Sequence, residues 1–372
     1  MTYYREAVNC FDKTFGGLRG ALENNDFMIN ESADSNVIKL FKAAGGGNLL
    51  INECYGGLGL SAMDSVLVQI ASGALSPSLA IASCMHHFSV ATLQEMVKYK
   101  PECLEQLLLK DIAKNKLLVA SAFCEGVPFS DVLDSSIFAT PHEKGYLISG
   151  IKEPCSLAYE MDILSASVKI DKGNKSELFV VILHKNVKGL SVRSYWKAPF
   201  FQASQSESIV LENVYVPKEM LSRLDVGTVD DVSATGYIWF EMLLCASYLG
   251  MAYGLLEKVN KLTLIPQNNA VLIYSKLESS AMLLAAIATD SFENKKILLG
   301  KVFLCRYCLQ KSIIDTVNKI VSFVGGINYL NNPCYAMLVQ AIQAFNFHPP
   351  GNRVLIENIL EYINSPIVEV GK

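Results

Sequence analysis

The sequence predicts an α+β protein in which a helical segment, a β-rich segment and a second helical segment follow one another. The spacing of apolar residues supports this order, because it is three to four residues up to about residue 118, close to two from residue 119 to 217, and helical again from residue 237. Hydrophobic residues make up 51% of the 372 residues and charged residues only 18%, so large buried cores are expected and disorder is excluded.

Three domains are predicted from these changes of spacing, namely residues 1–118 (helical), 119–221 (β-rich) and 222–372 (helical). The first domain has helical patterns at residues 65–74, 88–99 and 98–115. The second has β-rich runs, separated by turn residues, at 145–148, 163–168, 178–183, 190–192 and 209–211, which fit a small antiparallel barrel or sandwich. The third has long helical patterns at 237–262, 269–290, 296–324, 333–345 and 352–363.

Charge and composition exclude several classes of protein. Lys plus Arg is 32 and Asp plus Glu is 36, so the chain lacks the basic excess of a nucleic-acid-binding protein. The longest uncharged run, residues 65–94, is too polar to span a membrane, and the apolar run 242–256 is shorter than the roughly 20 residues that a span needs. No signal peptide is visible, and the ten cysteines lack a disulfide spacing. We therefore expect a cytoplasmic protein.

Five segments spread over nearly the whole chain carry a family resemblance. They are a glycine loop at residues 52–61 (NECYGGLGLS), residues 124–131 (CEGVPFSD), residues 145–152 (GYLISGIK), residues 212–217 (ENVYVP) and residues 323–329 (FVGGINY). In type and order, these segments resemble those of acyl-CoA dehydrogenases. The resemblance implies an N-terminal helical domain, a central antiparallel β-barrel and a C-terminal four-helix bundle.

The same resemblance implies a flavin enzyme. Members of the family hold FAD between barrel and bundle and reach the FAD of a neighbouring subunit, so a homodimer or homotetramer is expected. A carboxylate removes an α-proton from an acyl thioester while a β-hydride passes to flavin N5. The resemblance places cofactor contacts at Cys124, Ser130 and Ser156 of the β-domain and at the glycine turn of Gly325 and Gly326. No metal site is predicted.

The carboxylate that acts as the base in the family is missing. Counting forward from the glycine turn places its position on Pro349, and counting back from Gly351 places it on Pro350. Proline cannot accept a proton, and a positioned base contributes roughly 10²- to 10⁴-fold to a rate. This loss therefore changes the mechanism or the reaction.

Two other residues are candidates for a catalytic role. Glu241 lies in an apolar helix, next to Phe240, which occupies a position where some relatives carry the base. Burial there would raise the pKa of its carboxyl; the alternative is a carboxylate that is paired or faces solvent. His348 precedes the two prolines, and its neutral imidazole could abstract a proton or position a substrate hydroxyl. The alternative is a hydrogen-bonded histidine beside a rigid turn.

Several of the family's contacts to FAD are absent. After residues 258–261 the chain lacks the Arg-x-x-Phe-Gly segment whose Arg reaches the neighbouring subunit's FAD, Cys124 replaces a Thr, and Ser322 replaces a Gln. Losing one charge-assisted and two neutral contacts weakens binding by roughly 10²- to 10⁴-fold. We therefore expect FAD as the cofactor, bound weakly enough to be lost on purification.

The sequence thus predicts a divergent flavin-dependent oxidoreductase that takes hydride from an acyl thioester with a non-standard base. The acyl group would be linked to CoA or to an acyl carrier protein of a biosynthetic pathway. Two alternatives remain open. A flavin monooxygenase on the same fold is favoured by the aromatic-His-Pro sequence at residues 347–350, and a flavin-free protein that binds or scaffolds a carrier protein is favoured by the missing FAD contacts.

Overall fold

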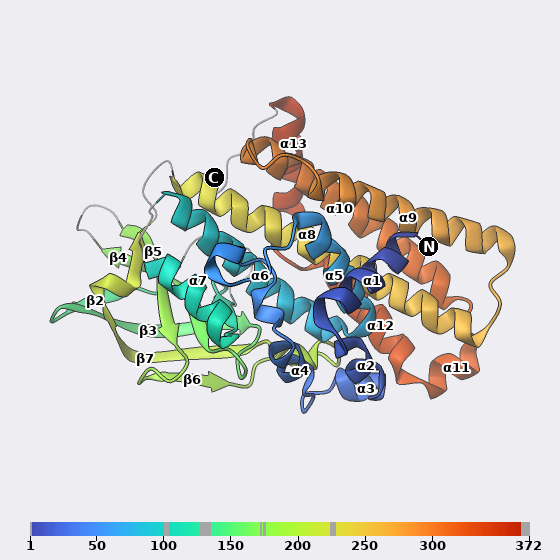
Figure 1. Cartoon of the computed structure of the whole chain (residues 1–372), viewed down its shortest axis with the longest axis horizontal. Coiled ribbons are helices and arrows are strands. Elements are labelled where there is room, and N and C mark those ends of the chain that lie inside the picture. Colours follow the sequence, from blue (N-terminus) through green and yellow to red (C-terminus); the bar gives the residue numbers. More distant parts are fainter. Residues whose placement is uncertain are drawn as a thin grey trace.

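A computed structural model describes residues 2–99, 104–126, 135–171, 173, 176–223 and 228–365. Helices occupy both ends of the described chain and strands its middle, which confirms the predicted α+β order (Figure 1). The strands gather at one end of the molecule. The long helices α8 (Thr228–Leu262), α9 (Gln267–Ala288) and α10 (Lys295–Val321) pack against one another and extend away from the strands.

The N-terminal part is helical, and polar side chains cap its long helices. Its elements are α1 (Thr2–Phe15), α2 (Leu18–Glu23), α3 (Phe27–Asn30), α4 (Val37–Ala43), η1 (Gly46–Asn48), η2 (Glu53–Tyr55), α5 (Ala62–Leu75), α6 (Pro77–Tyr99) and α7 (Leu104–Asn115). The hydroxyl of Ser61 accepts a hydrogen bond from the N–H of Asp64 at 3.0 Å, which caps α5. The buried carboxylate of Glu31 accepts from the N–H of Ser78 at 3.0 Å and so caps α6 from a distant loop.

The strands form two four-stranded sheets. One sheet has the order β1 (Val119–Ala122), β4 (Ile163–Asp171), β5 (Ser176–His184) and β8 (Leu221–Arg223). The other has the order β2 (Ala139–His142), β3 (Gly145–Cys155), β7 (Glu207–Pro217) and β6 (Leu190–Arg193), and the short helices η3 (Gln202–Ser204) and η4 (Lys218–Met220) flank β7.

The barrel expected from the resemblance is not closed in the part of the chain that the structure describes. The two sheets do not merge into one, and only the isolated parallel bridges Glu125–Glu153 and Phe138–Lys169 link them in the described residues. β1 pairs with β4 in parallel, whereas the other described strand pairs are antiparallel. Each predicted β-rich run lies within one of these strands. Alternating side chains therefore predicted the strands, whereas sheet closure and strand direction depend on pairing between segments far apart in the chain.

The C-terminal part is a helical bundle built around α8. After α10 come α11 (Gly326–Asn331), α12 (Pro333–Gln343), η5 (Ala344–Asn346) and α13 (Asn352–Asn364). Helix α8 packs against α5, α6 and α10, and nearly all of its residues from 242 to 256 are buried. Both α8 and α9 are long and apolar enough to cross a membrane by length and composition, but 89% of the α8 window is buried inside the protein, as in a core helix.

Glycines allow α5 and α8 to cross at very short range. A Cβ atom at Gly250 would lie 2.0 Å from the carbonyl oxygen of Ile70, and one at Gly73 would lie 2.2 Å from the carbonyl oxygen of Ser247. The two backbones therefore touch, and this contact helps to hold α8 in register against the N-terminal helices.

We expect Gly250→Ala to lower the free energy of unfolding by about 1–3 kcal/mol, because the added methyl group collides with a backbone carbonyl rather than with a flexible side chain. Urea unfolding measures the change. Gly20→Ala in α2 is the control, since open space surrounds its Cβ position, and it should be neutral or slightly stabilising. Equal stability of Gly250→Ala and the wild type would contradict a rigid contact.

Candidate functional site

A cavity of about 470 Å³ lies where the strands, α6, α8 and the turn after α12 meet. This volume is typical of a small-molecule site. Its walls are mainly aromatic and aliphatic, and most of its polar lining residues carry a hydroxyl group, namely Ser89, Thr92, Ser121, Ser156, Ser165, Ser206, Ser233 and Tyr237. Within the described ranges, no Asp, Glu, Lys or Arg side chain lines it. The cavity therefore suits an uncharged ligand.

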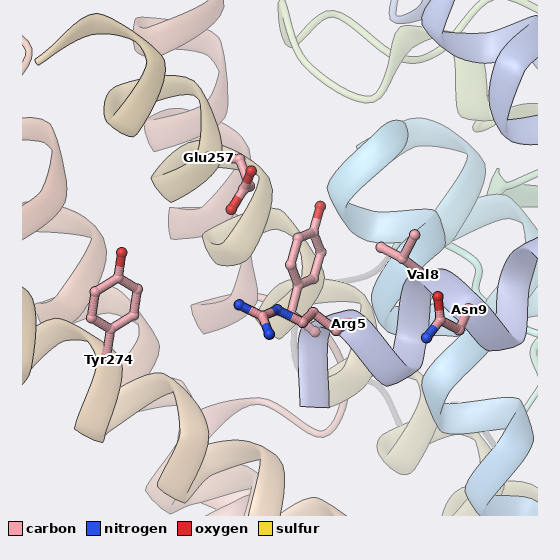
Figure 2. A pocket seen from close by; sticks show the side chains of 6 residues that line it. Arg5, Val8, Asn9, Glu257 and Tyr274 are labelled. Atoms are coloured by element: carbon pink, nitrogen blue, oxygen red, sulfur yellow. The ribbon is translucent and has the colours of Figure 1, made fainter. Parts of the chain in front are cut away.

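A second pocket, of about 490 Å³, lies between α1, α8 and α9 (Figure 2). Tyr4, Arg5, Glu257 and Tyr274 are among its lining residues, and burial, reinforced by the charge of Glu257, raises the pKa of Tyr4 to about 12. None of the sequence-predicted site residues within the described ranges lines this pocket. The first cavity is therefore the candidate site.

The turn after α12 reaches the cavity through Phe347, His348 and Pro349. The guanidinium of Arg306 on α10 holds this turn from behind, because Nη2 donates to the carbonyl of His348 at 2.8 Å and Nη1 donates to the carbonyl of Pro349 at 2.9 Å. A longer bond of 3.4 Å reaches the carbonyl of Phe345. A single buried side chain thus fixes the backbone that carries the cavity-lining histidine.

Glu241 on α8 balances the charge of this arginine. Nη1 of Arg306 lies 2.7 and 2.8 Å from the two carboxylate oxygens, and both side chains are fully buried. Burial raises the pKa of the Glu241 carboxyl, while the charge and hydrogen bonds of Arg306 act in the opposite direction. Glu241 does not line the cavity, so it occupies the paired state that the sequence left open as the alternative to a catalytic base.

His348 is a neutral hydrogen-bonding group. Its Nε2 lies 2.8 Å from the hydroxyl oxygen of Tyr248, which is fully buried on α8. Burial, together with the positive charge of Arg306, lowers the pKa of His348 to about 3. Burial also raises the pKa of Tyr248 well above its usual value. At pH 7 the imidazole is therefore neutral and the phenol keeps its proton.

The direction of this hydrogen bond follows from counting acceptors. The Tyr248 hydroxyl has no other acceptor in the described part of the chain, so we assign it as the donor to Nε2 of His348. The imidazole hydrogen then sits on Nδ1, which has no hydrogen-bond partner among the described residues. Since His348 lines the cavity, it presents an N–H donor to a ligand.

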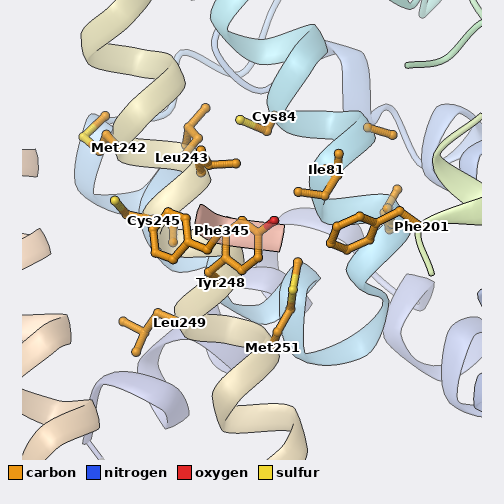
Figure 3. Close-up of a cluster of buried hydrophobic side chains, with 14 of the residues drawn as sticks. Ile81, Cys84, Phe201, Met242, Leu243, Cys245, Tyr248, Leu249, Met251 and Phe345 are labelled. Carbon is orange, nitrogen blue, oxygen red and sulfur yellow. The ribbon is translucent and has the colours of Figure 1, made fainter. Parts of the chain in front are cut away.

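Aromatic side chains pack against the Tyr248 member of the Tyr248–His348 pair. The rings of Tyr248 and Phe345 stack with centroids 4.2 Å apart and planes at 7°, and Phe201 meets Tyr248 edge-on at 6.4 Å (Figure 3). Tyr248 therefore has little freedom to rotate, and the position of its hydroxyl is set by the core.

The structure brings together three of the predicted site residues and separates the others. Cys124, Ser156 and His348 all line the candidate cavity, although they come from different parts of the chain. Gly325 and Gly326 form the exposed start of α11 and do not line it, and neither does Glu241. Ser130 lies outside the described residues.

Sequence reasoning missed Arg306 and Tyr248. The sequence does contain a signal for Arg306. Val302 lies four residues before it, and Leu309 and Ile313 lie three and seven residues after it. This spacing places the arginine on the apolar face of its helix. A charge on such a face needs a buried partner, and Glu241 in the apolar, buried helix α8 is a natural one. No comparable signal marks Tyr248, since an aromatic residue in a core helix is ordinary.

Comparison with known proteins supports the architecture. No protein-family profile matches the chain. The chain is 33% identical to isobutylamine N-hydroxylase of Streptomyces viridifaciens over 95% of its own length and 96% of that protein. It is 29% identical to a probable acyl-CoA dehydrogenase of Bacillus subtilis (strain 168), over 54% of this chain and 32% of that protein.

The fold is shared with solved structures. A structure of KijD3 in complex with FMN and dTDP-3-amino-2,3,6-trideoxy-4-keto-3-methyl-D-glucose superimposes with a TM-score of 0.81, at 16% identity, over the whole of this chain and 96% of that one. Helices, two sheets and a helical bundle, with a cavity where they meet, define the acyl-CoA dehydrogenase fold. The chain belongs to the acyl-CoA dehydrogenase family, as a divergent member.

Removing one member of the buried ion pair should be costly. We expect Arg306→Met to lower the free energy of unfolding by about 3–5 kcal/mol, because it leaves the Glu241 carboxylate buried without a partner. Combining it with Glu241→Gln should restore part of this loss. Arg353→Met, which removes an exposed ion pair on α13, should change stability little. Urea unfolding of the wild type, Arg306→Met, Glu241→Gln, the double variant and Arg353→Met tests this. A double variant as unstable as the sum of its two singles would contradict it.

The histidine should make stability depend on pH. An unfolded histidine takes up a proton below about pH 6.5, whereas native His348 stays neutral down to about pH 3, so acid favours the unfolded state. Relative to His348→Asn, the wild type should lose about 1.4 kcal/mol per pH unit below 6.5. Above pH 7 the difference between the two proteins should be constant. Urea unfolding at pH 5, 6, 7.5 and 8.5 measures this difference in stability. A difference that does not change with pH would show that the pKa of native His348 equals that of an unfolded histidine.

Proposed function

We propose that the chain is a flavin-dependent monooxygenase that N-hydroxylates a small, uncharged amine. The observation that carries this proposal is the cavity, which has apolar walls and no charged lining residue in the described ranges, and which holds a neutral histidine beside the position of the family's missing base. The likeness to isobutylamine N-hydroxylase over nearly the full length supports the reaction. Amine recognition is also consistent with KijD3, whose bound ligand carries an amino group.

The cavity residues fit a flavin ring. An isoalloxazine ring is planar and largely apolar with one polar edge, and Phe123, Trp196 and Phe240 offer aromatic surface while Ser156 and Ser206 offer hydroxyls. A phosphate would have to lie outside this uncharged cavity. We propose FMN rather than the expected FAD, since KijD3 binds FMN. A bound reduced flavin supplies the oxidising chemistry, in which one atom of dioxygen goes to the amine nitrogen and the other leaves as water.

The role of His348 follows from its protonation. A base works best when its pKa lies near the working pH, and a pKa of about 3 makes this imidazole a weak proton acceptor. We assign it instead to orienting the substrate, by donating from Nδ1 to the lone pair of an uncharged amine. An ammonium ion has no lone pair and would lose its hydration in an uncharged cavity, so this arrangement selects the free base.

Dehydrogenation of an acyl thioester, the function predicted from the sequence, has less support. Removing an α-proton requires a base, and no carboxylate among the described residues lines the cavity. We therefore propose no acyl carrier protein as partner. The predicted cytoplasmic location and homo-oligomeric assembly remain part of the proposal.

The direct test supplies enzyme with FMN, a flavin reductase, NADH and dioxygen, and follows isobutylamine by mass spectrometry. The expected product is the hydroxylamine, heavier by one oxygen atom. His348→Asn should lower kcat/KM by roughly 3- to 12-fold, the effect of one lost hydrogen bond. Flavin reduction by an acyl thioester, without amine oxidation, would favour the dehydrogenase instead.

Selection of the free base predicts a pH dependence. An alkylammonium ion has a pKa of about 10.4, so the neutral fraction rises about tenfold per pH unit below that value. The KM for isobutylamine should therefore fall about tenfold per unit from pH 7 to 9. 2,2,2-Trifluoroethylamine, whose three fluorine atoms keep it mostly uncharged at pH 7, is the control and should show a flat KM. A flat KM for both amines would contradict the assignment.

A further inference from the structure

Three serine hydroxyls form a chain that begins in the cavity wall and ends in the backbone. The Oγ atoms of Ser156 and Ser206 lie 2.8 Å apart, and those of Ser206 and Ser204 also lie 2.8 Å apart. Ser204 Oγ lies 2.7 Å from the carbonyl oxygen of Phe201. Ser156 and Ser206 line the cavity, whereas Ser204 is fully buried behind it.

The carbonyl group at the end of this series of serine hydroxyls fixes the direction of each hydrogen bond in the series. A carbonyl oxygen only accepts, so Ser204 must use its single hydrogen on Phe201. Ser206 must then donate to Ser204, and Ser156 must donate to Ser206. The hydroxyl of Ser156 is left with lone pairs alone to offer to the cavity, although a free serine could either donate or accept.

We propose that this serine relay (Ser156, Ser206 and Ser204) makes the cavity selective for reduced flavin over oxidised flavin. The inference rests on the proposed function, and it sets the N5 edge of the flavin ring against Ser156, the cavity residue at which the family resemblance implies a cofactor contact. Oxidised flavin has a bare acceptor nitrogen at N5, and two-electron reduction turns that nitrogen into an N–H donor. A hydroxyl that can only accept forms a hydrogen bond with the N5–H of the reduced ring. Against the oxidised ring, its lone pairs face the lone pair of N5, so no hydrogen bond forms and the two atoms repel each other.

The test measures equilibrium binding of FMN to the purified chain in both oxidation states. Oxidised FMN is titrated in air by fluorescence, and FMN reduced with dithionite is titrated without oxygen. The wild type should bind the reduced form roughly tenfold more tightly, the effect of one well-made hydrogen bond. The midpoint potential of bound FMN should accordingly lie about 30 mV above that of free FMN.

Variants separate the relay from other causes. Ser204→Ala removes the residue that sets the direction without touching the cavity wall, and Ser206→Ala removes the link itself. Both should bring the ratio of the two dissociation constants to within about threefold of one. Ser72→Ala removes a buried hydroxyl that, among the described residues, donates to the carbonyl of Val68 within α5, and it should leave the tenfold ratio unchanged. Thermal unfolding of each variant confirms that it is folded.

The outcomes are distinguishable. If FMN binds in neither state, the proposed function fails, and this inference fails with it. If FMN binds the wild type equally well in both states, the relay proposal is overturned while the flavin enzyme stands. A tenfold preference that survives in both Ser204→Ala and Ser206→Ala also overturns it, because the preference then comes from elsewhere in the site.

Discussion

The buried contact between Arg306 and Glu241 is the interaction on which the geometry of the candidate site depends. It joins α10, α8 and the turn that carries His348, because the guanidinium that pairs with the carboxylate also donates to the carbonyls of His348 and Pro349. Taking two charges out of water costs several kcal/mol for each ion, so the pair persists only when its hydrogen bonds are well made. The turn cannot shift without breaking them. This explains how a segment whose Phe347 is 81% exposed can still hold a histidine in a defined position.

Much of the fold could be predicted because apolar spacing is a local property. The pattern at residues 237–262 lies within α8, and the run at 178–183 lies within β5. Two features were out of reach. The parallel pairing of β1 with β4 joins residues 119–122 to residues 163–166, and the close α5–α8 crossing needs Gly73 and Gly250 to face each other's helix. Both depend on contacts between distant segments, which no local pattern records.

The site could be predicted only in part, for the same reason. The family resemblance implied cofactor contacts at Ser156 and Cys124, and both residues line the cavity. The chemical state of His348 and Glu241 depends on partners 100 and 65 residues away. Burial next to a phenol and a guanidinium gives a neutral imidazole, and the same guanidinium holds the buried Glu241 carboxylate in an ion pair. Sequence identifies such groups, whereas their neighbours decide what they do.

The substituted proline accounts for how this fold can host the proposed reaction. A carboxylate in the cavity would attract an ammonium ion and keep the amine in the form that has no lone pair to oxidise. Pro349 brings no ionisable group to that position, and its carbonyl is turned to Arg306. Glu241, although near in sequence to the cavity-lining Phe240, is neutralised by the same arginine. The arginine therefore has two effects at once, because it anchors the turn and removes negative charge from the space where an uncharged amine would bind. A cavity kept free of charge in this way is poorly suited to taking protons from carbon and well suited to admitting a free base.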